Sequence, residues 1–341
     1  AVDLVPGQDT MGELSRGNDS AVYRFNAAAG DKFFFSTLGA AQNTGSVTWR
    51  LIDPFGRTEG SSSNTNASSG PVTTKSTGRY LLVVEAANSG SSSQKFGFNL
   101  TPVQDEVHAL TLNQTSQVQI QPGQTQKLVF DLLQPTSVVL DVTQAGSASN
   151  WTTFWSLKGS EGFQRTDVDV YDTHAQRLEL AAGHYELSLY KNGYDGEWSG
   201  QVRVALHTVE ALTDAVLATP TTGTMADPRA SASFALDLTA GQRFNLTGST
   251  TNGNVGWSLY DRYGQKVMGG DYLNSTVTPV TISRSDRYTL VLDAFSSNAA
   301  NAQVGYQFTA RQFVDGAEAL PADGVVLGQI AVPGQVQSYT F

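Results

Sequence analysis

The sequence contains no cysteine. This absence excludes disulfide bonds, zinc sites built from thiolates and a thiol nucleophile. Charged residues are also few, at 15% of the chain, whereas Gly, Ser, Thr and Asn are abundant. Such a composition is more usual outside the cell than inside it. Because a bacterial protein exported without oxidative folding has this make-up, we expect a secreted or cell-surface protein of bacterial origin.

Basic residues and long hydrophobic runs are scarce as well. Lys and Arg number 21 against 31 Asp and Glu, which gives a net charge of −10. A nucleic-acid partner needs a basic face, so none is expected. No apolar run approaches the roughly 20 residues of a membrane-spanning helix, and we expect no membrane insertion. The acidic charge favours solubility and admits divalent cations.

Motifs for catalysis are missing too. The four histidines have neither metal-ligand spacing nor a G-x-S-x-G partner, and no Gly-rich phosphate loop joins a strand to a helix. The sequence therefore predicts no catalytic residue and no enzyme. No cofactor is expected, with calcium as the one ligand that the acidic charge would admit.

An internal repeat is the main feature that is present. Three stretches, "WRLIDPFG", "WSLKGSEG" and "WSLYDRYG", begin 106 and 102 residues apart at Trp49, Trp155 and Trp257. A tyrosine follows each Trp after 30 or 31 residues, at Tyr80, Tyr185 and Tyr288. Phenylalanines before the Trp align as Phe25, Phe130 and Phe234. A period of this length indicates tandem units.

Within each unit the pattern is typical of strands. Runs of four to eight residues such as "KFFFS" and "TWRLI" alternate in polarity and are separated by Gly, Pro, Asp and Asn. The sequence thus predicts an all-β chain of tandem antiparallel β-sandwich domains. The predicted repeats are 1–103, 104–208 and 209–312. Residues 313–341 either are the first strands of a fourth repeat or complete a neighbouring fold.

Two units carry a family resemblance most clearly. The stretches "AGDKFFFSTL", "WRLIDPFG" and "STGRYLLVV", and their counterparts "AGQRFNLTGS", "WSLYDRYG" and "SDRYTLVL", resemble the bacterial pre-peptidase C-terminal (PPC-like) β-sandwich domain. The resemblance covers all three units and is weakest in the second, where "WSLKGSEG" lacks the Asp. It implies domains appended to secreted proteases or repeated in large surface proteins. Some relatives bind collagen or calcium, which would need matching ligands here.

The repeated aromatics have a structural interpretation. Trp49, Trp155 and Trp257 could form a platform for a sugar, but their recurrence favours plugs in the core between two sheets. The Asp-x-x-Gly that follows Trp49 and Trp257 fits a β-turn better than a calcium site. Tyr80, Tyr185 and Tyr288 are predicted as tyrosine corners, in which the hydroxyl caps the backbone at a strand entry.

The second unit departs from the others in "RTDVDVYDTH", residues 165–174. Asp167 and Asp169 would share one face of a strand, with Asp172 close by, and like charges so placed are costly without a cation or solvent. These three residues are the candidate metal ligands. A solvated strand face is the favoured alternative.

The second unit departs again in "YKNGYDGEWSG", residues 190–200, where the other units have small polar residues. Tyr190, Tyr194 and Trp198 are the candidate ligand-binding residues, because rings stack on sugars or protein surfaces beside carboxylates. The alternative, slightly favoured, is that Trp198 packs against the next domain.

Together these features predict a non-enzymatic structural or adhesive segment, a spacer or stalk, whose first partners are the neighbouring repeats of the same chain. One alternative is a module that binds a glycan or an extracellular matrix protein through 190–200. Another is a set of accessory domains of a secreted hydrolase.

Overall fold

The computed structural model describes residues 1–15, 19–39, 47–62, 68–86, 93–144, 153–170, 175–191, 199–225, 230–270, 272–295, 303–321 and 324–341. Strands dominate these residues, and the single helical element among them is the 3-10 turn η1 (Val209–Ala211). The expectation of a nearly all-β chain with several antiparallel sheets is confirmed. The four predicted domain ranges stay a prediction.

The first nine strands form two sheets, which we call the first unit. The five-stranded sheet has the order β1 (Val2–Asp3), β3 (Ser20–Ala27), β8 (Gly78–Ala86), β5 (Val47–Ile52) and β6 (Thr58–Ser62). The four-stranded sheet has the order β2 (Asp9–Leu14), β9 (Gln94–Val103), β4 (Lys32–Thr37) and β7 (Ser69–Thr73).

The second unit repeats this topology strand for strand. Its five-stranded sheet has the order β10 (Glu106–Ala109), β12 (Gln126–Leu132), β17 (Gly183–Lys191), β14 (Thr153–Gly159) and β15 (Gln164–Asp169). Its four-stranded sheet has the order β11 (Thr115–Ile120), β18 (Gly200–Thr208), β13 (Thr136–Gln144) and β16 (Ala175–Leu180).

The third unit repeats it again. Its five-stranded sheet has the order β19 (Thr213–Asp214), β21 (Ser231–Leu238), β26 (Asp286–Ala294), β23 (Val255–Tyr260) and β24 (Lys266–Gly270). Its four-stranded sheet has the order β20 (Thr221–Thr224), β27 (Gly305–Phe313), β22 (Arg243–Thr251) and β25 (Val280–Thr281).

A short strand pair, β28 (Gly316–Ala319) and β29 (Gln337–Thr340), follows the third unit. Its strands are parallel, as are β1 with β3, β10 with β12 and β19 with β21. Each five-stranded sheet is therefore antiparallel except for this one pair at its edge. In each unit the strand between these two in sequence (β2, β11 or β20) belongs to the other sheet. The next strand can therefore lie beside the first and run in the same direction. The pair β28–β29 therefore resembles the parallel strand pair with which each unit begins.

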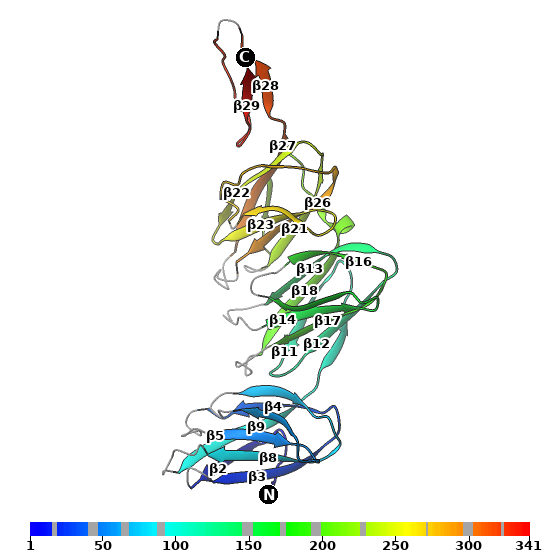
Figure 1. Ribbon diagram of the computed structural model, residues 1–341, viewed down its shortest axis with the longest axis vertical. Coiled ribbons are helices and arrows are strands. Elements are labelled where there is room, and N and C mark those ends of the chain that lie inside the picture. The colour runs from blue at the N-terminus through cyan, green and yellow to red at the C-terminus, as the bar shows by residue number, and fades with distance from the viewer. Residues whose placement is uncertain are drawn as a thin grey trace.

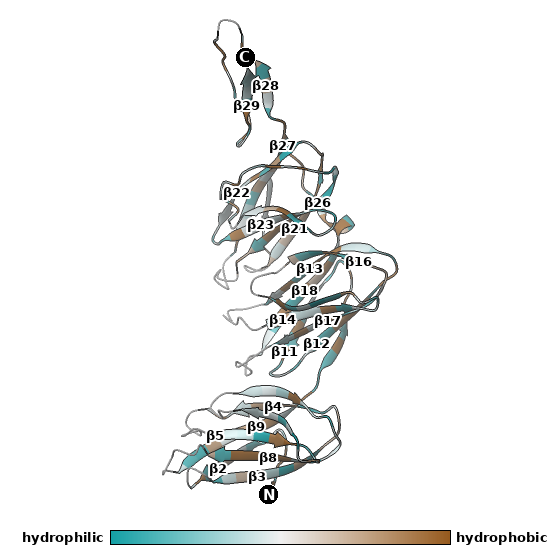
Figure 2. Ribbon diagram, in the orientation of Figure 1, coloured by the Kyte–Doolittle hydropathy of each residue, from teal (hydrophilic) through white to brown (hydrophobic). Residues whose placement is uncertain are grey.

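The two sheets of each unit enclose one buried core, which makes the units sandwich-like. In the first unit, inward-facing residues of both sheets form one cluster that includes Phe35, Trp49, Tyr80 and Phe98. The second and third units have equivalent clusters around Trp155 and Trp257. Figure 2 shows hydrophobic colour along β8, the central strand of its sheet. Strand alternation sends every second side chain inward, so each sheet covers one side of the core.

The strand register corrects one element of the sequence alignment. Tyr80 pairs with Phe25 and Tyr185 with Phe130, but Tyr288 pairs with Leu236 rather than with Phe234. Residues two apart on a strand face the same side. The core therefore accepts an aromatic at either position, and an alignment by aromatics alone slips by two residues.

The units follow one another along the long axis of the molecule (Figure 1). The N-terminus lies at one end and the pair β28–β29 at the other. Neighbouring units therefore meet at three joints, which we call the first joint (first and second units), the second joint (second and third units) and the third joint (third unit and β28–β29).

Candidate functional site

The three repeated tryptophans are buried in the cores. Trp49 and Trp155 are 1% exposed and Trp257 is 2% exposed. Trp49 stacks on Phe35 with 4.8 Å between ring centroids. The indole Nε1 of each Trp is buried and finds no hydrogen-bond partner in the described part of the chain. A ring enclosed in this way has no face left for a sugar.

The three repeated tyrosines cap the backbone at strand entries. The hydroxyl of Tyr80 donates to the carbonyl of Ser76, that of Tyr185 to Ala181 and that of Tyr288 to Arg284, each over 2.9 Å. Burial raises the pKa of all three hydroxyls. Each hydroxyl therefore stays protonated and acts as a donor in its turn.

The Asp-x-x-Gly segments are closed turns. Asp53 Oδ1 accepts the backbone N–H groups of Phe55 and Arg57, over 2.9 and 2.8 Å. Asp261 makes the same two bonds in the third unit, each over 2.9 Å. In the second unit Gly159 takes the place of the Asp, and a Cβ there would lie 2.6 Å from the ring of Tyr185. The carboxylates of Asp53 and Asp261 thus accept hydrogen bonds from the backbone of their own turns.

The structure brings together residues from the two unusual stretches of the second unit. Tyr190 on β17 donates its hydroxyl hydrogen to Oδ1 of Asp167 on β15. Ser156, on the intervening β14, lies 3.0 Å from the Tyr190 hydroxyl and accepts the backbone N–H of Asp167 over 3.1 Å. Burial, and then the bond to Asp167, raises the pKa of Tyr190. The candidate metal ligand Asp167 and the candidate ligand-binding residue Tyr190 therefore lie on the same face of the five-stranded sheet of the second unit.

The remaining candidate residues are placed only in part. Asp169 pairs in register with Phe154, whose ring stacks on Tyr190 with 6.4 Å between centroids. Asp172, Tyr194 and Trp198 lie outside the described residues. Within the described ranges no group of three or more His, Asp or Glu could hold a metal ion. Asp167 has φ 55° beside a register shift, so the local strand is irregular where the carboxylates lie.

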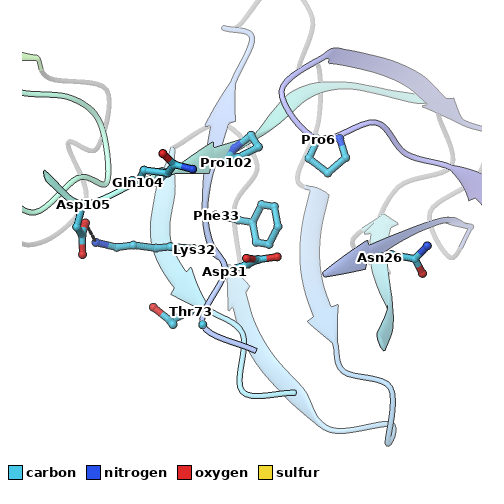
Figure 3. Close-up of a pocket in the computed structure, with 11 residues that line it drawn as sticks. Pro6, Asn26, Asp31, Lys32, Phe33, Thr73, Pro102, Gln104 and Asp105 are labelled. Carbon is cyan, nitrogen blue, oxygen red and sulfur yellow. Dashed lines mark hydrogen bonds and ion pairs between the residues drawn. The ribbon is translucent and has the colours of Figure 1, made fainter. Parts of the chain in front are cut away.

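Sequence reasoning missed the joints, where side chains of successive units meet. At the first joint, Lys32 Nζ lies 2.7 Å from Asp105 Oδ1, and Figure 3 shows the two side chains meeting beside an open pocket of about 670 Å³. The same Asp105 oxygen accepts the backbone N–H of Thr125 over 2.9 Å. Lys32 also reaches the Thr125 hydroxyl at 3.2 Å. We call this three-residue arrangement the clasp.

A turn of the second unit rests on the first unit beside the clasp. Phe34 faces away from its own core yet is only 1% exposed, because Gly123 approaches its ring so closely that a Cβ there would lie 2.9 Å away. Gly123 has φ 73°. Gln124 Nε2 donates to the carbonyl of Gln104 over 2.9 Å, which ties the turn to the linker.

The third joint has the same clasp. Arg243 Nη1 lies 2.9 Å from Asp315 Oδ2, and Asp315 Oδ1 accepts the backbone N–H of Val336 over 2.9 Å. Gln335 Nε2 donates to the carbonyl of Val314 over 3.1 Å. Asn245, 5% exposed at the position equivalent to Phe34, donates to the carbonyl of Pro333 over 2.9 Å.

The second joint is built differently, because two sheet faces meet. Val139 and Ala175 of the second unit form a buried cluster with Val291 of the third unit and Val209 of η1. Ser137 on β13 occupies the position equivalent to that of Lys32 on β4 and Arg243 on β22.

A buried cation crosses the second joint. Arg177 on β16 is 5% exposed, and its Nη1 donates to the carbonyl of Arg287 over 3.2 Å and to the Thr289 hydroxyl over 2.9 Å. Gly264 also belongs to this joint, since a Cβ there would lie 2.7 Å from the carbonyl oxygen of Arg177.

A sequence signal for the clasp exists. Pro-Gly-Gln occurs three times, at 6–8, 122–124 and 333–335, and the last two copies, 211 residues apart, lie in the turns that rest on the preceding unit. A basic residue follows "AGD" at Lys32 and "AGQ" at Arg243, and an Asp stands in the linker at Asp105 and Asp315. These elements recur together, so they could have been found as a second, two-unit periodicity.

Comparison with known proteins gives no family. No protein-family profile matches the chain, and the search of curated proteins found no match. Among solved structures, the pre-peptidase C-terminal domain of a Bacillus anthracis collagenase is 16% identical and covers 30% of this chain and 96% of that domain, with a TM-score of 0.25.

Two other solved structures are also similar at this level. The CUB1-EGF-CUB2 domains of rat MASP-1 are 10% identical over 60% of this chain and 99% of that one, with a TM-score of 0.20. Tripeptidyl peptidase 2 is 9% identical over 88% of this chain and 33% of that one, with a TM-score of 0.23. These scores carry no argument about function. No helix among the described residues is long and apolar enough to cross a membrane.

Proposed function

We propose that the chain is a non-enzymatic spacer or stalk segment of a large secreted or cell-surface bacterial protein. In this proposal it consists of tandem antiparallel β-sandwich domains of the PPC-like kind, and its main partners are its own neighbouring units. The observation that supports it is the construction of the joints. Each unit is attached to the next by specific side chains rather than by a linker alone.

A spacer must keep its length and direction, which requires that neighbouring units hold a fixed orientation. Two clasps and one face-to-face joint supply such contacts. In the clasp, one carboxylate binds a cation of the preceding unit and a backbone N–H of the following unit, so both units share one anchor. Interdomain contacts that include buried residues restrict the relative motion expected of linked domains.

Pulling on single molecules tests this proposal. Each unit of about 100 residues should unfold as one event and lengthen the chain by roughly 35 nm. Three such events, together with an elongated particle in small-angle X-ray scattering, are the expected result. A compact particle in solution, or gradual extension without discrete events, contradicts the spacer.

A second candidate function is ligand binding by the outer face of β14, β15 and β17. It is favoured by the grouping of Phe154, Tyr190 and Asp167, because the stretch with Tyr194 and Trp198 follows Tyr190 in the sequence. Rings and a carboxylate on one face suit a glycan or an extracellular matrix protein.

Binding to a glycan array and to matrix proteins tests this candidate. Binding that is lost in Trp198→Ala and retained in the control Phe55→Ala supports it, because Phe55 is an exposed aromatic on a turn of the first unit. The absence of binding across the whole array contradicts it.

A further inference from the structure

Two carboxyl groups lie at the second joint, one from each unit. Asp141 lies on the outer face of β13 and is 9% exposed, and Asp293 lies on the outer face of β26. Ser231, the register partner of Asp293, donates its hydroxyl hydrogen to Asp141 Oδ2 over 2.7 Å. Ala175, the register partner of Asp141, donates its backbone N–H to Asp293. Each carboxyl therefore contacts the strand beside the other.

The two carboxyls differ in their hydrogen bonds. Both oxygens of Asp141 accept a hydroxyl, from Thr143 over 2.8 Å and from Ser231 over 2.7 Å. Asp293 is half-buried as a residue, but its Oδ1 is buried and finds no hydrogen-bond partner among the described residues. A buried carboxylate oxygen without a donor is costly, whereas a protonated carboxyl can itself donate.

The burial of Asp293 is the main reason why its neutral form is favoured. Burial and then the charge of Asp141 raise the pKa of Asp293 to about 8, although Lys266 on β24 and the N–H of Ala175 oppose the shift. Arg177 on β16 is held by the carbonyl of Arg287, Thr289 and Glu179. Tyr260 on β23 also feels Asp293, since burial and the nearby carboxylate both raise its pKa.

We propose that the second joint is a proton-dependent latch. It is docked while the pair Asp141–Asp293 carries a single negative charge, and it loosens when both carboxyls are ionised. The proposal does not depend on the spacer function, because it concerns only the equilibrium between docked and separated units.

The direction of the pH effect follows from proton linkage. An Asp has an ordinary pKa of 3.8, and burial and Asp141 raise the pKa of docked Asp293 to about 8; in this proposal, separation of the units returns it toward the ordinary value. Between these two values the docked state holds one more proton, so docking is strongest at low pH and weakens as the pH rises. The docking constant should fall by up to about tenfold per pH unit across this window and level off above it.

Because the chain has no cysteine, two introduced cysteines can be labelled with dyes without any competing thiol. Lys158→Cys on β14 and Gln307→Cys on β27 place two dyes on exposed positions of sheets that do not form this joint. Energy transfer between the dyes in the full chain, recorded from pH 5 to pH 9, reports the docked fraction. We expect one narrow high-transfer population at pH 5 and a broader, lower-transfer population at pH 9.

Two variants and one control decide the matter. Asp293→Asn should keep the docked population at every pH. Asp141→Asn removes a charge that raises the pKa of docked Asp293, so the docking constant should fall over a narrower pH window and the joint should loosen less at pH 9 than in the parent chain. Glu210→Gln, an exposed carboxyl of η1 at the same joint, should behave as the parent chain.

Three results would overturn the latch. The first is an energy-transfer distribution of the parent chain that does not change with pH. The second is an Asp293→Asn chain that keeps the full pH dependence. The third is restoration of the docked state at pH 9 by calcium, which would make the pair a cation site instead.

Discussion

The first and second joints attach neighbours of the same topology by opposite means. The first uses a turn of the second unit, one cation and one linker carboxylate, and pockets of about 670 and 540 Å³ lie beside it. The second buries valines, Arg177 and Asp141 between two sheet faces, with Asp293 half-buried among them. The comparison teaches that the shared fold leaves the mode of attachment open. The outward-facing residues of each sheet decide it.

Removal of the buried cation of the second joint should have the largest effect. Arg177→Ala leaves the Thr289 hydroxyl and the carbonyl of Arg287 unpaired in a buried interface, and we expect a loss of about 4 kcal/mol in the free energy of unfolding of the joined pair. Denaturant unfolding of the full chain measures it. The exposed Arg165→Ala is the control, and an equal loss in both variants would contradict the assigned role.

Filling the close contact of the first joint should have the next largest effect. Gly123→Ala places a Cβ 2.9 Å from the ring of Phe34 at φ 73°, and we expect a cost of about 3 kcal/mol from strain and displacement of the ring. Gly162→Ala is a matched control, because its φ is 82° but the space around it is open.

The control separates the two contributions. Gly162→Ala should cost only about 1.5 kcal/mol, from the backbone conformation alone. Thermal unfolding of both variants gives the comparison. If the two variants lose the same stability, the turn does not press on Phe34.

Weakening the clasp should have a smaller, salt-sensitive effect. Asp105→Asn removes the charge that pairs with Lys32, and we expect a loss of about 1 kcal/mol at low salt that shrinks at 1 M NaCl, because the pair is only partly buried. Energy transfer between dyes on the first and second units reports the joint. Asp315→Asn should act alike at the third joint, whereas a salt-independent loss in both would argue against an electrostatic clasp.

Chelation of divalent cations should have the smallest effect of all. The carboxylates of the Asp-x-x-Gly turns accept backbone N–H groups, and Asp167 accepts a tyrosine hydroxyl. We therefore expect the same thermal midpoint with and without EDTA. A fall of several degrees in EDTA, restored by added calcium, would revive the cation hypothesis for the second unit.

The repeat itself could be predicted from the sequence, because Trp and Tyr mark fixed places in the core and at strand entries. The register of the third unit could not, since Phe234 and Leu236 face the same core and either can carry the aromatic. The joints were missed for a different reason. Residues such as Phe34, Asp141 and Arg177 lie on outer faces that ordinarily meet solvent, and their burial depends on which neighbour they face.

The candidate site of the second unit was predicted as two separate stretches. Their convergence on Tyr190 and Asp167 depends on β14 lying between β15 and β17, which is a matter of strand order. Strand order is fixed by long-range pairing and cannot be read from local alternation. The functional roles of Asp169, Asp172, Tyr194 and Trp198 stay predictions.

The alternation of joints has a consequence for how such a chain can lengthen. A clasp needs a basic residue on the leading unit and a Pro-Gly-Gln turn on the following one, whereas the face-to-face joint needs two matched outer faces. Duplication of a single unit would bring a surface that suits a clasp against a surface that suits the face-to-face joint. Duplication of two adjacent units preserves every pairing. A segment of two adjacent units, rather than a single sandwich-like unit, is therefore the smallest segment that can be duplicated with all its joints intact.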